Sequence, residues 1–213
     1  MKKALLLLLA LSALVLFLLL FKKPIEEKSV LKPTIIVSTF ALYDIVNHLA
    51  GESLSLSMLV PFGVDIHAYE PTPKNMVDIS KSSLFIYSGA GLEPWIKGRS
   101  LASNSLDISK HVHLRSLAEE EDHDEEANEH EQHGHQHGES EYDPHYWLDI
   151  DNMIESAKII KDEIIKLNSI ESAQLEQNFT QYVSALQTLR NHYKEALKNC
   201  NNPVLVLNHN AFG

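Results

Sequence analysis

Three short apolar runs, separated by segments with helical spacing, constrain this fold more than any other feature of the sequence. The runs Thr34–Val37, Leu54–Val60 and Leu84–Tyr87 are rich in residues that favour strands. Between them, apolar residues over Phe40–Leu49 and around Met76–Ser80 recur at helical spacing. Strands that alternate with helices in this way form parallel sheets with crossover helices. The sequence therefore predicts an α/β lobe over residues 33–150.

Two longer amphipathic helices are expected after this lobe, within residues 151–200. The first carries apolar residues from Ile154 to Leu167, and the second carries a stripe from Leu175 to Leu197. At 1.5 Å per residue the second helix would span about 40 Å, which makes it a candidate rigid connector. The apolar run Val204–Leu207 then predicts the first strand of a second lobe within residues 203–213, and we expect most of that lobe to be missing.

The N-terminus has the pattern of an export signal. Lys2 and Lys3 precede Ala4–Phe21, an 18-residue apolar run broken only by Ser12. This length is close to the roughly 20 residues that cross a bilayer, so residues 1–23 are a signal peptide or a retained membrane anchor. Both alternatives place the rest of the chain in the periplasm or another extracytoplasmic space.

The net charge of −11 comes from one segment. Residues 119–141 hold eleven acidic side chains and no Lys or Arg, whereas the rest of the chain holds 18 acidic and 18 basic residues. The body of the protein is therefore neutral, and it has no basic stripe that would bind nucleic acid. With so little apolar content, residues 119–141 are expected to be disordered without metal.

The same segment is rich in histidine. Five histidines lie within fifteen residues, namely His123, His130, His133, His135 and His137. Dense imidazoles among carboxylates bind metals such as Zn²⁺, Ni²⁺ and Cu²⁺, which predicts an auxiliary metal-capturing loop. The alternative is a solvated acidic spacer.

Three other histidines lie in predicted loops. His67 and His209 follow predicted strands at the positions where open parallel sheets bind ligands, and His145 lies in a third loop. Singly, each would more often be a structural histidine, but together they supply the three imidazoles of a tetrahedral Zn²⁺ site. A carboxylate or water would complete it. Four carboxylates are candidates to orient the imidazoles or to ligate: Asp65, Glu70, Asp143 and Asp149.

Four motifs occur in order along the chain. They are GVDIHAYEPTP around His67, LFIYSGAGLEPWI over residues 84–96, DPHYWLD over 143–149 and NHNAFG over 208–213. This series resembles the zinc- and manganese-specific solute-binding proteins of ABC importers, and the acidic histidine-rich insertion resembles the zinc-uptake branch. Two departures are Ile66, where the family usually has Pro, and the absence of the later region that carries a further carboxylate.

The resemblance implies two α/β lobes joined by a long helix, with the metal between them. By this resemblance the first lobe supplies His67 and His145, and His209 opens the second lobe. It further implies a zinc cargo and a membrane permease as partner, and no enzymatic activity. Binding of manganese or another divalent metal, and a non-functional fragment, are the alternatives.

An enzyme is a weaker alternative. A three-histidine zinc hydrolase would use a metal-bound hydroxide and a base such as Glu70, and no His-Glu-x-x-His helix is present. The Gly89-Ala90-Gly91 sequence is expected to be a turn at a strand end, because no Lys-Ser or Lys-Thr follows it as in a phosphate-binding loop.

Overall fold

The structure is a computed structural model that describes residues 11–12, 17, 32–117, 141–167 and 170–200. The chain divides into two units, Met1–Leu31 and Lys32–Gly213, and the second unit contains the sheet and the long helices. None of the helices in the described part of the chain combines the length and the hydropathy that a membrane span needs. The predicted export signal lies almost entirely outside the described residues, as do the acidic histidine-rich loop and the strand predicted at 204–207.

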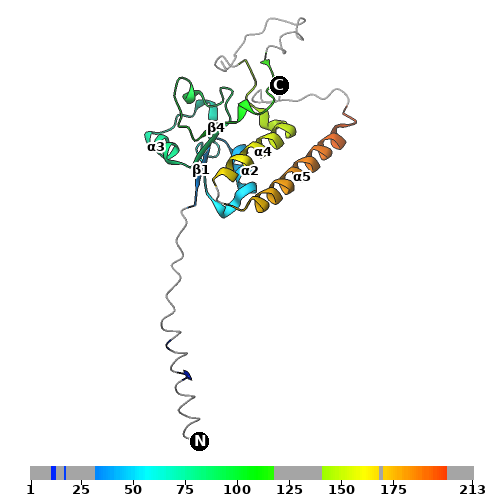
Figure 1. Cartoon of the computed structure of the whole chain (residues 1–213). Coiled ribbons are helices and arrows are strands. Elements are labelled where there is room, and N and C mark those ends of the chain that lie inside the picture. The colour runs from blue at the N-terminus through cyan, green and yellow to red at the C-terminus, as the bar shows by residue number, and fades with distance from the viewer. Residues whose placement is uncertain (1–10, 13–16, 18–31, 118–140, 168–169, 201–213) are drawn as a thin grey trace, which may run out of the picture. The chain divides into compact units, whose positions relative to one another are not determined.

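A four-stranded parallel sheet forms the centre of the unit (Figure 1). Its strands are β1 (Thr34–Val37), β2 (Ser55–Met58), β3 (Leu84–Tyr87) and β4 (Ser105–Asp107), in the order β2-β1-β3-β4. The predicted α/β class and parallel sheet are confirmed. The bounds of β1 and β3 are those predicted, β2 is shorter than predicted, and β4 was not predicted.

Burial explains why the sequences of the central strands are unbroken apolar runs. Ile35, Ile36 and Val37 of β1 are all buried, because layers of side chains cover both faces of this strand. The outer strand β2 instead alternates, with Ser55 and Ser57 exposed and Leu56 and Met58 partly buried. Only one face of this edge strand meets the core.

Helix α2 (Phe40–Ala50) follows β1 and crosses back over the sheet. The Thr39 side chain accepts a hydrogen bond from the Leu42 N–H, and Gly51 ends the helix at a φ of 49°. The predicted apolar stripe began at Phe40, but this residue is 56% exposed. The buried face is instead formed by Leu42, Ile45, Val46, Leu49 and Ala50.

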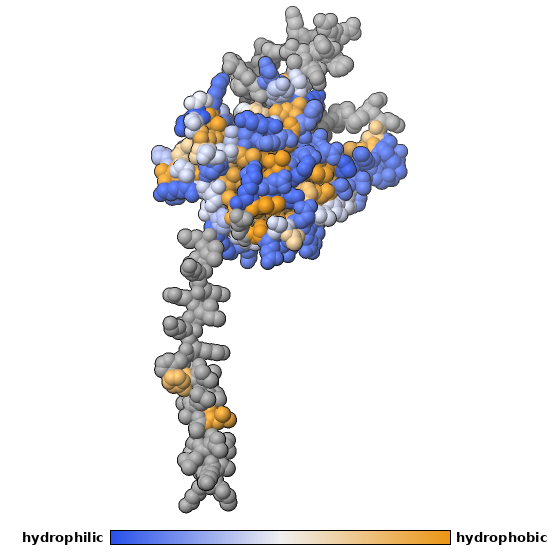
Figure 2. All heavy atoms as spheres, in the orientation of Figure 1, coloured by the Kyte–Doolittle hydropathy of each residue, from blue (hydrophilic) through white to orange (hydrophobic). Residues whose placement is uncertain are grey.

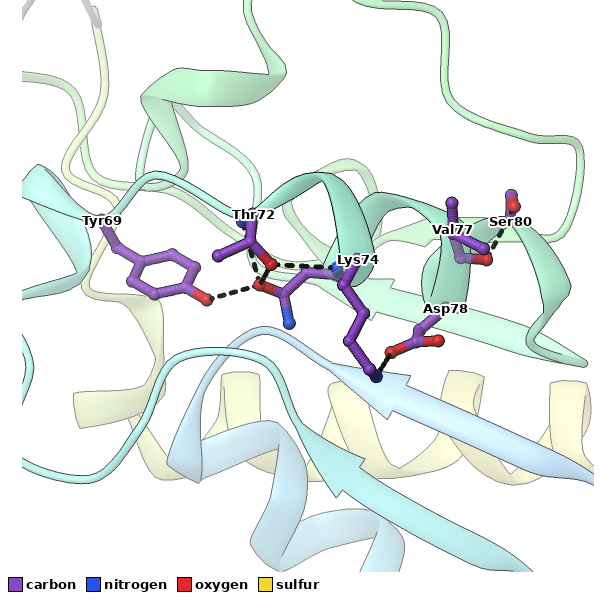
Figure 3. Close-up of polar contacts among 7 residues, drawn as sticks. Tyr69, Thr72, Lys74, Val77, Asp78 and Ser80 are labelled. Carbon is purple, nitrogen blue, oxygen red and sulfur yellow. Dashed lines mark hydrogen bonds and ion pairs between the residues drawn. The ribbon is translucent and has the colours of Figure 1, made fainter.

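Helix α3 (Pro73–Lys81) begins three residues before the predicted segment. Thr72 and Asn75 form a capping box, in which the Thr72 Oγ1 accepts from the Asn75 N–H and Asn75 Oδ1 accepts from the Thr72 N–H (Figure 3). Tyr69 Oη also donates to Asn75 Oδ1 at 3.4 Å. This cap ties the loop that contains His67 to the start of α3.

The two faces of the sheet have separate cores. On one face, α2 packs with α4 (Ile150–Lys166) and α5 (Ser172–Leu197), which confirms the two long amphipathic helices. On the other, the buried residues are Ile36, Leu59, Ile79, Phe85 and Trp95. Apolar residues also reach the surface between hydrophilic ones on the face of the unit seen in Figure 2.

Helix α5 is packed against the core from Leu175 to Leu186. Leu175 and Tyr182 are buried, and Tyr182 Oη donates to Asp44 Oδ2 of α2 at 3.0 Å. Beyond Arg190 every residue of this helix is exposed, including Tyr193 and Leu197. Helix α5 includes the whole stripe predicted from Leu175 to Leu197, and its role as a connector stays a prediction.

Replacing Ile160 by Ala tests the core between α4 and the sheet. Ile160 is fully buried, so we expect a loss of about 2–4 kcal/mol in the free energy of unfolding, measured by urea denaturation. Leu197→Ala is the control, because this residue is 58% exposed, and it should change the value by less than about 0.5 kcal/mol. Equal losses in the two variants would contradict the assigned core.

Candidate metal centre

His67 lies on a short helical turn, Ile66–Ala68, in the loop that follows β2. The Asp65 carboxylate accepts a hydrogen bond from the His67 N–H at 2.9 Å and thereby starts this turn. The imidazole of His67 is partly buried, whereas Asp65 and Glu70 on either side of it are exposed. The carboxylate of Asp65 therefore fixes the backbone of His67.

His145 is held by a carboxylate two residues earlier in the chain. Its ring Nδ1 lies 2.6 Å from Asp143 Oδ1, and its backbone N–H donates to the same oxygen at 2.9 Å. An ionised carboxylate can only accept, so the proton of this hydrogen bond lies on Nδ1. With Nδ1 used in this hydrogen bond, Nε2 is the ring atom that would coordinate a metal. His145 is 7% exposed.

The structure brings His67 and His145 together. Their ring centroids are 5.5 Å apart, with an interplanar angle of 61°. Two imidazoles that bind one tetrahedral ion with bonds of about 2.0–2.1 Å have centroids about 5 Å apart, so the observed pair suits a shared metal. This juxtaposition joins a loop after β2 to the segment before α4.

The remaining residues predicted for the metal site are Asp149, His209 and the five histidines of the acidic segment. Asp149 caps α4, where its side chain accepts from the Asp151 N–H at 2.7 Å. His209 and the five histidines of the acidic segment lie outside the described residues. Within residues 32–117, 141–167 and 170–200, no three His, Cys, Asp or Glu side chains are close enough to hold a metal ion.

The two ends of the acidic segment are paired just before this site. Ser116 and Tyr142 form an antiparallel bridge, the Leu117 N–H donates to the Glu141 carbonyl at 3.0 Å, and the Asp143 N–H donates to the Arg115 carbonyl at 2.9 Å. Asp143 thus takes part both in this pairing and in the contact with His145.

Aromatic and apolar side chains flank the histidine pair. The Trp147 ring lies 5.3 Å from the His145 ring at 71°. A pocket of about 290 Å³ reaches from Ile66 to Trp147, and Phe40 and Phe62 also line it with their rings edge to face at 5.9 Å. The histidines are therefore bordered by a partly exposed apolar surface on one side.

A buried carboxylate at the same edge of the sheet was missed by the sequence reasoning. Glu93 is 3% exposed, and its two oxygens accept from the N–H groups of Ser88 at 2.9 Å and Gly89 at 3.0 Å. Burial raises the pKa of the Glu93 carboxyl, while the Ser38 hydroxyl and the two N–H groups act in the opposite direction. The signal available in the sequence was that Glu93 lies within a motif that also contains Gly, Pro and Trp.

Tyr87 lies beside this carboxylate at the end of β3. Its hydroxyl donates to Asp107 Oδ2 at 3.3 Å. Burial, together with the negative charge of Asp107, raises the pKa of Tyr87 to about 12. A hydrogen bond from the Tyr87 hydroxyl to the Asp107 side chain therefore joins the carboxyl ends of β3 and β4.

The family model for ZnuA, the periplasmic zinc-uptake complex component A, matches residues 35–213. The chain belongs to this family. Its members are non-enzymatic solute-binding proteins of ABC metal importers, which agrees with the expectation that the chain is not an enzyme. The resemblance predicted from the motifs is thereby confirmed at the level of zinc and manganese solute-binding proteins.

Relatives named for both metals are similar to the chain. The high-affinity zinc uptake system protein ZnuA of Bacillus subtilis (strain 168) is 29% identical, over 84% of this chain and 56% of the relative. The manganese-binding lipoprotein MntA of Halalkalibacterium halodurans is 27% identical, over 72% and 46% respectively. A putative metal-binding protein of Treponema pallidum is 28% identical, over 85% and 58%. The chain spans about half the length of these relatives.

Solved structures share the fold. Zn(II)-bound AdcA from Streptococcus pneumoniae superposes with a TM-score of 0.68 at 22% identity, over 85% of this chain and 36% of that one. The metal-dependent lipoprotein YcdH from Bacillus subtilis gives 0.61 at 24% identity, over 78% and 56%. These likenesses support the α/β architecture described above.

Two glycines allow a matched test of the turn after β3. A Cβ on Gly89 would lie 2.0 Å from Asp107 Oδ1, whereas a Cβ on Gly98 would meet nothing within 4 Å, and both have positive φ, 78° and 74°. We expect Gly89→Ala to cost about 2–4 kcal/mol of unfolding free energy and Gly98→Ala about 1 kcal/mol. Thermal unfolding measures both, and equal costs would contradict the close approach of Asp107.

Proposed function

We propose that this protein binds Zn²⁺ outside the cytoplasm through His67, His145 and His209 and delivers it to the membrane permease of an ABC importer. The observation that carries the proposal is the pair formed by the first two histidines, with centroids 5.5 Å apart. Membership of the ZnuA family supports the transport role.

The hydrogen bond to Asp143 prepares His145 for this role. A carboxylate that accepts from the Nδ1 proton fixes the tautomer and the ring orientation, leaves Nε2 as the coordinating atom and makes the ring a better ligand. His67 approaches from the other loop with its backbone fixed by Asp65. His209 would supply the third imidazole, and a water or carboxylate the fourth ligand.

Zinc is the preferred cargo because the proposed ligands are imidazoles. Neutral nitrogen ligands suit Zn²⁺, whereas Mn²⁺ favours carboxylate and water oxygens. The alternative is manganese or another divalent metal in the same type of site, since the relatives include a manganese-binding lipoprotein.

The proposal also gives roles to the acidic histidine-rich segment and to residues 1–23. His123, His130, His133, His135 and His137 would capture zinc near the site at lower affinity. Residues 1–23 would export the chain, as a cleaved signal or as an anchor, so that the binding lobe faces the permease from outside.

Metal titration tests the ligands. Zn²⁺ should bind the full chain at least 10-fold more tightly than Mn²⁺, and His67→Ala should weaken zinc binding by about 100-fold or more, because it removes one ligand. Competition with a chromophoric chelator measures these affinities. His192→Ala is the control, since this histidine is exposed on α5.

The outcomes of the titration separate the parts of the proposal. An unchanged zinc affinity in His67→Ala would remove this residue from the site, and a preference for Mn²⁺ would favour the alternative cargo. A variant without residues 119–141 should bind fewer zinc ions with low affinity, while its tightest zinc site is retained.

Asp143→Asn tests the orienting hydrogen bond. The amide cannot accept as strongly from Nδ1, so zinc affinity should fall about 10- to 100-fold while the fold is retained. Asp78→Asn is a matched control, because this carboxylate pairs with Lys74 on the surface of α3. Calorimetric titration checks both, and an equal effect in the two variants would contradict a specific role for Asp143.

A further inference from the structure

Trp147 packs directly against one of the two paired histidines. Its ring centroid lies 5.3 Å from that of His145 with an interplanar angle of 71°, so the two rings meet edge to face. The same indole packs against the ring of Tyr146 at 5.7 Å and 80°. Contacts of this kind favour one relative orientation, because the positive edge of one ring faces the negative surface of the other. The indole therefore restrains the tilt of the imidazole.

The hydrogen bond to Asp143 restrains the same imidazole in a different way. It sets the distance between Nδ1 of His145 and one carboxylate oxygen, 2.6 Å, and the ring can still tilt about that contact. The torsion that turns a histidine ring, χ2, has broad energy minima, so its own preference does not fix the plane of the ring. An indole in contact with the ring limits this rotation. Asp143 and Trp147 therefore restrain different motions of one side chain.

Trp147 is itself held in place by its turn and by the core. It is the middle residue of the short helical turn Tyr146–Leu148, in which the Leu148 N–H donates to the His145 carbonyl at 3.1 Å. The partly buried indole packs against the core that α2 and α4 share. A ring held both by a hydrogen-bonded turn and by a core is a fixed support, because protein cores are close-packed.

The indole also faces the loop that carries the other histidine. Trp147 and Ile66, the residue before His67, both line the apolar pocket of about 290 Å³. The described residues that line this pocket include neither histidine, although the ring of Trp147 contacts that of His145. Trp147 therefore separates His145 from the space in the pocket, which agrees with the 7% exposure of this histidine.

We propose that Trp147 is a positioning residue for His145. The indole holds the imidazole at the tilt that gives the angle of 61° to the ring of His67, and it excludes water from one side of the pair. The inference rests on the proposed metal function and adds to it a side chain that would not touch the metal. Its role differs from that of Asp143, which selects the coordinating nitrogen.

Two substitutions separate the ring contact from general packing. Trp147→Leu keeps an apolar side chain and removes the ring, whereas Trp147→Phe keeps an aromatic ring that can meet His145 edge to face. Leu148→Ala is the control from the same turn, since Leu148 is 43% exposed. The second tryptophan of the chain, Trp95, belongs to the core on the other face of the sheet, and Trp95→Phe leaves Trp147 as the only indole.

The experiment uses the full chain with Zn²⁺ and, as a spectroscopic probe, Co²⁺. We expect Trp147→Leu to weaken zinc binding about 10-fold and to change the visible absorption of the cobalt-loaded protein, and Trp147→Phe to stay within about 3-fold of the wild type. Leu148→Ala should match the wild type in both measurements. In Trp95→Phe, Zn²⁺ should change the fluorescence of Trp147, because a charge arrives beside an indole that contacts a ligand. In Trp147→Phe, the fluorescence of Trp95 should stay constant.

Three results would overturn the inference. One is a Trp147→Leu protein that is less stable to urea but keeps the zinc affinity and cobalt spectrum of the wild type. Another is an equal loss of zinc affinity in Trp147→Phe and Trp147→Leu. The third is a Trp95→Phe protein that binds Zn²⁺ with no change in fluorescence, and this result decides if Trp147→Leu does not fold. A wild type and a His145→Ala variant with equal zinc affinity would instead reject the proposed function itself.

Discussion

Parallel pairing of β1 with β2 and β3 is the constraint on which the rest of the structure depends. Parallel strands place their carboxyl ends at the same edge of the sheet, so the loops that follow them meet there. The loop after β2 carries His67, and the turn after β3 carries Glu93. Burial of β1 on both faces is consistent with its place at the centre of the sheet, between β2 and β3.

Strands that are buried on both faces were the easiest elements to predict. β1 and β3 are continuous apolar runs with clear ends, so their bounds were found from the sequence. β4 has only three residues, Ser-Leu-Asp, and owes its place to pairing with β3. Such a short strand has no pattern of its own. The face of α2 was misjudged at Phe40 because its spacing fits the helix, whereas the buried side is set by the sheet beneath.

The candidate site could be predicted only in part. Histidines in loops after strands suggested a shared edge, and the motif resemblance selected His67 and His145, but no spacing rule gives the distance between two rings from separate segments. The structure supplies that distance and the hydrogen bond to Asp143. Glu93 was not predicted, because a carboxylate inside an apolar motif reveals its partners only when the turn is folded around it.

The pairing of residues 115–117 with 141–143 has a consequence for how such a protein can change over evolution. Because backbone hydrogen bonds close the chain at this point, the residues between the two paired segments can differ in number and composition while Asp143 and His145 keep their positions. The entropy cost of closing a longer loop rises only slowly with its length. This location is therefore a permissive insertion point, where the intervening segment can be lengthened, shortened or replaced without a change in the lobe that carries His67 and His145.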